Sequence, residues 1–209
     1  MNATTAVALA NDPALVSRRR ILHAAWMAIA LAILIEVLLV LLRQRASAAA
    51  AVADFAGKVS WSVIVCGALA VARAAGKGAM GVVGLLASPL ALTVARMSHK
   101  AASQALGLPP SGAMPAWAIL VVKSIEYAAL GLAIEWVVRR GLGMKAHASA
   151  GLAVGALFGG TIVGMQAPAD ALVAVSQGVN EVLFPVGCSL TLYAADRIAK
   201  RGAPGTTSA

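Results

Sequence analysis

"AWAILVVKSIEYAALGLAIEWVV", residues 116–138, is an apolar run with two full charges, Lys123 and Glu126, near its middle. At a rise of 1.5 Å per residue, about 20 apolar residues form a helix that crosses about 30 Å of hydrocarbon. The run therefore predicts a transmembrane helix. Lys123 and Glu126 lie one helical turn apart on the same face, where their side chains can pair.

The rest of the chain has the same apolar character. Of its 209 residues, 60% are hydrophobic and 12% are charged, whereas soluble domains are about half apolar and about a quarter charged. An excess of apolar residues over the whole length indicates a polytopic membrane protein, not a soluble domain with one anchor. We therefore expect an all-α fold in a lipid bilayer, with about six transmembrane helices.

Six apolar segments are candidates for these helices: residues 21–42, 57–75, 79–98, 116–138, 147–166 and a last segment that ends near Ala195. The second segment is short, because only 14 residues separate Lys58 from Arg73. Both side chains would have to extend toward the interfaces for this helix to cross.

The last segment allows two interpretations, because Gln177, Asn180 and Glu181 interrupt its apolar sequence. It is either one interrupted span over residues 171–195 or a loop followed by a short span over residues 182–195. The sequence does not decide between them.

The N-terminal region resembles an export signal, with "SRRRILHAAW" (17–26) before an apolar run and small residues after it. The apolar run 21–42 is longer than the hydrophobic part of a usual signal and suits a full span. We therefore expect an uncleaved first helix.

The basic residues predict the orientation of the chain. With the N-terminus inside, the inner segments hold eleven lysines and arginines and the outer segments hold five. Cytoplasmic segments carry the excess of these residues, so we expect cytoplasmic tails at residues 1–17 and 201–209. The abundance of alanine favours a bacterial inner membrane.

Two halves of the chain resemble each other weakly. "LAILIEVLLV" (31–40) aligns with "LGLAIEWVVR" (130–139) and places Glu36 opposite Glu135. Weaker matches follow in the same order, and the proline-containing linker 107–115 falls between a first half, 18–106, and a second half, 116–200. Three spans per half require that the second copy be inverted, as in many channels and secondary transporters.

Intramembrane charges are the candidates for a functional site. A charge at the bilayer centre costs about 2.5–3.5 kcal/mol on insertion scales, so these side chains must face protein or water. The sequence predicts an ion or solute path lined by Lys123, Glu126, Tyr127, Glu36 and Glu181. The alternative for Lys123 and Glu126 is a self-neutralised pair that fixes one helix to a neighbour. Glu135, one turn before Arg139, is explained by pairing at the interface.

The fifth segment carries a packing signal, "GLAVGALFGGTIVG" (151–164). Small residues every four positions allow membrane helices to approach closely. The sequence predicts a tight contact within the subunit or across a homo-oligomer or larger membrane complex, formed by Gly151, Gly155, Gly159, Gly160 and Gly164.

Several function classes lack their sequence signals. The histidines and cysteines show no metal-ligand spacing, and no phosphate-binding loop or nucleophile motif is present. Aromatic residues make up 4% of the chain, which argues against nucleic-acid binding despite the net charge of +9. We therefore expect no enzyme activity, no cofactor and no metal. The sequence favours a small transport protein, a channel or secondary transporter for an ion or small solute. The alternative is a non-transporting subunit that scaffolds a larger membrane complex.

Overall fold

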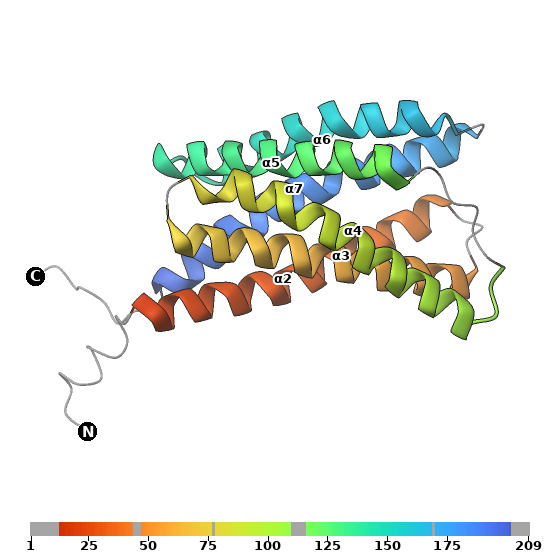
Figure 1. Ribbon diagram of the computed structural model, residues 1–209, viewed down its shortest axis with the longest axis horizontal. Coiled ribbons are helices and arrows are strands. Elements are labelled where there is room, and N and C mark those ends of the chain that lie inside the picture. The colour runs from red at the N-terminus through yellow and green to blue at the C-terminus, as the bar shows by residue number, and fades with distance from the viewer. Residues whose placement is uncertain (1–12, 44–46, 77, 110–115, 169, 202–209) are drawn as a thin grey trace, which may run out of the picture.

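In the computed structural model, the described residues are 13–43, 47–76, 78–109, 116–168 and 170–201. Over these residues the chain forms six helices and no strand (Figure 1). The helices are α2 (Pro13–Arg43), α3 (Ala48–Ala75), α4 (Ala79–Ala105), α5 (Ala116–Arg139), α6 (Met144–Gln166) and α7 (Ala171–Arg201). Each is long and apolar enough to cross a membrane. The expected all-α membrane fold with six transmembrane helices is confirmed.

Two helices begin earlier than expected. Helix α2 begins at Pro13, so residues 13–17, which the sequence predicted to be part of the N-terminal tail, are helical; proline at a first helical position costs no hydrogen bond. Helix α3 begins at Ala48 after an N-cap, since the Ser47 side chain accepts a hydrogen bond from the Ala50 N–H at 3.2 Å. The alanines that follow Ser47 are strong helix formers. Lys58 therefore lies well inside a 28-residue helix, not at its end.

The last segment is one helix, α7, which runs from Ala171 to Arg201 without interruption. It includes Gln177, Asn180 and Glu181, and Pro185 lies inside it. The loop interpretation is therefore wrong. Residues 1–12 and 202–209 of the expected tails and residues 110–115 of the expected linker lie outside the described residues.

The helices pack in chain order, each against the next, and α2 packs against α7 to close the bundle (Figure 1). The start of α2 and the end of α7 lie at the same end of the bundle. Asp196 of α7 joins them there, since it pairs with Arg20 of α2 at 2.5 Å and with Arg73 of α3 at 3.4 Å. We call this group the Asp196 cluster.

Glycines set the closest helix contacts. A Cβ on Gly151 would lie 2.5 Å from the Val186 Cα, and one on Gly155 would lie 2.9 Å from the Val182 Cα. Gly159 packs in the same way on the Glu181 side chain. These three glycines therefore join α6 to α7 within the subunit.

Gly160 and Gly164 are exposed, and a Cβ on either would meet nothing within 4 Å. In this chain they do not take part in the α6–α7 contact. A second close contact, between α4 and α5, was not expected from the sequence. There Gly84 packs against the backbone of Tyr127, and Gly131 packs against the backbone of Met80.

Candidate functional site

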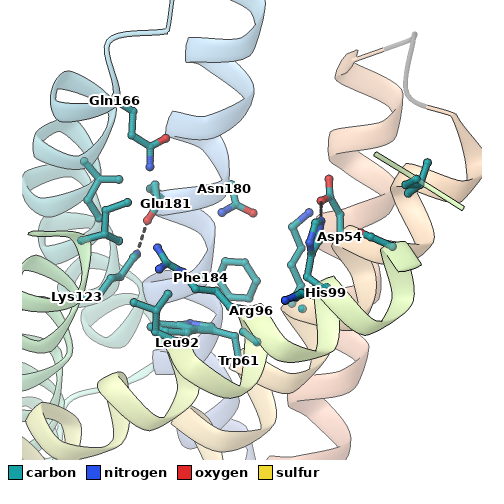
Figure 2. A pocket seen from close by; sticks show the side chains of 18 of the residues that line it. Asp54, Trp61, Leu92, Arg96, His99, Lys123, Gln166, Asn180, Glu181 and Phe184 are labelled. Carbon is teal, nitrogen blue, oxygen red and sulfur yellow. Dashed lines mark hydrogen bonds and ion pairs between the residues drawn. The ribbon is translucent and has the colours of Figure 1, made fainter. Parts of the chain in front are cut away.

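A cavity of about 790 Å³ opens between the helices at the end of the bundle opposite the Asp196 cluster (Figure 2). Five helices, α3 to α7, contribute residues to its wall. The apolar part of the wall includes Trp61, Leu92, Ile119, Ile162 and Phe184. Its charged side chains are Asp54, Lys58, Arg96, Lys100, Lys123 and Glu181. The volume lies in the range of small-molecule sites, about 300–1,000 Å³.

Lys123 lies in the inner part of this cavity, on the side of α5. Its ammonium pairs with Glu181 of α7 across the helix interface, and its Nζ lies 2.8 Å from the Glu126 Oε2 on its own helix (Figure 2). Lys123 and Glu181 are each 8% exposed, and Glu126 is fully buried. We call these three residues the floor triad. It places two carboxylates on one ammonium, near the middle of α5.

Aromatic rings complete the surroundings of this ammonium. The Lys123 Nζ lies 5.7 Å from the Trp61 ring centroid and 5.8 Å from that of Tyr127, within the range of cation–π attraction. The Tyr127 hydroxyl accepts a hydrogen bond from the Trp61 Nε1–H at 3.2 Å, and the two rings meet edge to face. Tyr127 is buried and does not line the cavity. It fixes Trp61, which does.

Glu36, like Tyr127, contacts a residue of the cavity wall without lining the cavity itself. Its carboxylate pairs with Lys58 of α3, and Lys58 lines the cavity while Glu36 does not. The five predicted path residues thus divide into two groups. Lys123 and Glu181 line the cavity, whereas Glu36, Glu126 and Tyr127 lie behind it, each in contact with a lining residue.

Glu135 lies apart from the cavity. It pairs with Arg139 at 2.5 Å and accepts a hydrogen bond from the Gly78 N–H. This agrees with the interfacial pairing expected for it, and its opposite position on α5 follows from a spacing of nine residues after Glu126.

Several polar wall residues were not singled out in the sequence. His99 of α4 pairs with Asp54 of α3 at 3.2 Å, and Asn180 of α7 lines the wall near Glu181 (Figure 2). A signal for them was present. Asp54, Lys58 and Trp61 recur at helical spacing on one face, as do Arg96, His99, Lys100 and Ser103. These two faces meet in the cavity because α3 and α4 are antiparallel neighbours.

Arg96 and Lys100 differ from the other charged wall residues. Asp54, Lys58, Lys123 and Glu181 each have an ion-pair partner. Within the described residues, neither Arg96 nor Lys100 has one. Figure 2 shows Arg96 extending from α4 into the cavity. Two positive charges are therefore available to a ligand.

Beyond the floor triad the helices are closely packed. Buried apolar side chains fill this part of the bundle, among them Leu69 of α3, Leu130 and Ile134 of α5, and Leu192 of α7. Cys66 and Cys188 are buried in the same core and are free thiols. The cavity thus ends partway through the bundle, and the Asp196 cluster lies at the far end of this core.

Among the described residues, no group of three or more histidine, cysteine, aspartate or glutamate side chains could hold a metal ion. No protein-family model, curated protein or solved structure matches this chain. The physical arrangement of the cavity is therefore the basis for assigning a function.

Proposed function

We propose that this integral membrane protein is a small secondary carrier that moves an ion or small solute through the cavity. The observation that carries the proposal is the convergence of polar side chains from five helices on one cavity, whose inner part holds the buried floor triad. Charged residues inside membrane segments are expensive and mark transport paths when they converge on a water-accessible space.

Two features favour a carrier over the other candidates. A scaffold subunit would neutralise its charges in isolated pairs, whereas here the pairs of Glu36, Asp54 and Glu181 all lie at the wall of one cavity. An open channel would continue past Lys123, but the apolar core closes the bundle there. A cavity open at one end and closed at the other is what one state of an alternating-access carrier requires.

The arrangement of the two halves supports the same proposal. The cavity lies between α3 and α4 of the first half and α5, α6 and α7 of the second. Glu36 and Glu135, which the sequence alignment pairs, lie toward opposite ends of the bundle because α2 and α5 run in opposite directions. Inverted repeats place their binding sites at such an interface. With cytoplasmic termini in a bacterial inner membrane, the cavity opens to the outside.

The floor triad is the coupling site of this carrier. With both carboxylates ionised its net charge is negative, which is unfavourable in a buried position. A proton on the buried Glu126 carboxylate neutralises it. A solute that draws Lys123 or Glu181 away therefore changes the proton affinity of the site, and this links solute movement to proton movement.

The test is a flux screen on purified protein in liposomes, with protons, inorganic ions and small metabolites as solutes. The double variant Lys123→Met/Glu126→Gln removes two charges of the floor triad at similar side-chain size. Lys145→Met is the matched control, because Lys145 is exposed at the start of α6, away from the cavity.

We expect a solute-dependent flux that the double variant loses and the control retains. If no solute crosses with the folded wild-type protein, the carrier assignment is wrong and a scaffolding subunit becomes the better explanation.

A further inference from the structure

The charged groups of the cavity wall indicate which solute it can accept. Each carboxylate of the wall already has a side-chain partner: Asp54 pairs with His99, and Glu181 pairs with Lys123. Lys58 is in turn occupied by Glu36. The available groups are thus the guanidinium of Arg96 and the ammonium of Lys100, and both attract an anion.

Arg96 is the better placed of the two. It lies on the face of α4 that also carries Leu92, and its side chain extends into the cavity (Figure 2). A guanidinium offers a planar set of donors that matches the two oxygens of a carboxylate or phosphate. Lys100, one turn farther along α4, lies nearer the end of the helix and adds positive charge near the cavity opening.

The other residues of the cavity wall indicate which chemical groups the rest of the solute carries. Trp61 and Phe184 present aromatic surface beside Arg96, and Leu92, Ile119 and Ile162 add aliphatic surface. The side-chain oxygen of Asn180 is buried and has no hydrogen-bond donor in the described part of the chain. A ligand hydroxyl or N–H group can satisfy it, since a buried acceptor without a donor is unfavourable.

We propose that the cavity binds an amphipathic organic anion, whose carboxylate or phosphate head is held by Arg96 and whose apolar body packs on Trp61 and Phe184. The proposal names the solute class of the proposed carrier and rests on that function for its biological role. The binding itself can be measured without transport.

Trp61 provides the measurement. The other tryptophans, Trp26, Trp117 and Trp136, are exposed on the outer surface, so the variant Trp26→Phe/Trp117→Phe/Trp136→Phe leaves one tryptophan, in the cavity wall. This variant in nanodiscs is titrated with ligands of one body and different heads: phenylacetate, benzyl phosphate, phenylacetamide and phenethylammonium. The matching butyl series tests an aliphatic body.

We expect saturable changes in Trp61 fluorescence with an anion, and affinities at least about tenfold weaker for the amide and ammonium forms. Arg96→Gln should weaken anion binding by about 10- to 100-fold, as loss of a charge-assisted hydrogen bond does. Arg96→Lys should weaken it less. Arg140→Gln, at the turn after α5, is the control and should bind as the parent does.

The two anion arms distinguish a carboxylate head from a phosphate head. Equal or tighter binding of the ammonium or amide ligand would overturn the proposal, as would unchanged anion binding in Arg96→Gln or no saturable response to either anion. Anion binding without flux would contradict the proposed carrier function and support the anion site. Flux of a cation or neutral solute without anion binding would support the carrier function and contradict the proposal that its solute is an organic anion.

Discussion

Lys123 is the residue on which the buried charges of the cavity floor depend. Its ammonium is the cation beside both Glu126 and Glu181, and the two carboxylates have different surroundings. Glu181 lines the cavity, where water can reach it, whereas Glu126 is fully buried. Removing the lysine therefore leaves one carboxylate that water can hydrate and one that it cannot.

The substitution Lys123→Met should destabilise the protein by about 3–5 kcal/mol, the usual effect of leaving a buried charge without its partner. Adding Glu126→Gln should recover most of that loss, because the remaining carboxylate of Glu181 faces the cavity. The measurement is the thermal stability of both single variants and the double variant in one detergent, combined as a double-mutant cycle. Additive effects would show that the two residues are not coupled.

At the level of helices, small residues determine which surfaces can approach. Gly151, Gly155 and Gly159 allow α7 to lie directly on α6, and Gly84 and Gly131 do the same for α4 and α5. The two contacts bring α4 and α5, and α6 and α7, close enough for their side chains to share one cavity. The glycine spacing thus determines the position of the floor triad, since Gly159 packs on the Glu181 side chain.

Gly151→Ala and Gly160→Ala place the same methyl group on the two sides of α6. At Gly151 the new Cβ would lie 2.5 Å from the Val186 Cα, so we expect a loss of about 1–3 kcal/mol from overpacking. At Gly160 nothing lies within 4 Å, and alanine should be neutral or stabilise the helix by up to about 1 kcal/mol. Melting temperatures of the two variants test this. Equal destabilisation at both positions would place a contact on the Gly160 side as well.

The sequence predicted the existence of the six helices, but not the full extent of α3 and α7. Apolar length was enough for the six helices, since a membrane span is recognised by composition alone. It was not enough for the start of α3, because the charges of Asp54 and Lys58 interrupt the apolar sequence while the helix continues through them. It also failed at α7, where polar side chains face a cavity that only the packing of five helices creates.

The site was predicted in part for the same reason. Lys123 and Glu181 were identified because charges stand out in an apolar run. Arg96, His99 and Asp54 did not stand out, because they lie at or beyond the ends of the expected apolar segments 57–75 and 79–98, where charges are ordinary. Their place in the wall depends on how α3 and α4 pair, which the sequence alone does not give.

Considered as a whole, the molecule is open at one end and closed at the other. The Asp196 cluster joins α2, α3 and α7 at the closed end. Between this cluster and the cavity lies the buried core with its two free thiols, Cys66 and Cys188. A carrier must open this end in its other state. The thiols would then become accessible to reagents.

Asp196→Asn should favour that opening, because it weakens both ion pairs of the Asp196 cluster. We expect the native thiols to react with a small maleimide at least about tenfold faster, a shift of about 1.4 kcal/mol in the opening equilibrium. Lys145→Met serves as the control and should react at the wild-type rate. An unchanged rate in Asp196→Asn would show that the cluster does not hold the closed end.

Orientation in the membrane relates the cavity to the cell. Gln104 lines the cavity at one end of the bundle. Leu142 lies in the turn after α5, at the same end of the bundle as the Asp196 cluster. Both residues are exposed. In a background with Cys66→Ser and Cys188→Ser, Gln104→Cys and Leu142→Cys each provide one accessible thiol. If the termini are cytoplasmic, as the excess of basic residues predicts, an impermeant maleimide added to intact cells labels Gln104→Cys alone. Permeabilised cells should label both. Labelling of Leu142→Cys alone in intact cells would reverse the orientation, and the cavity would then collect its solute from the cytoplasm.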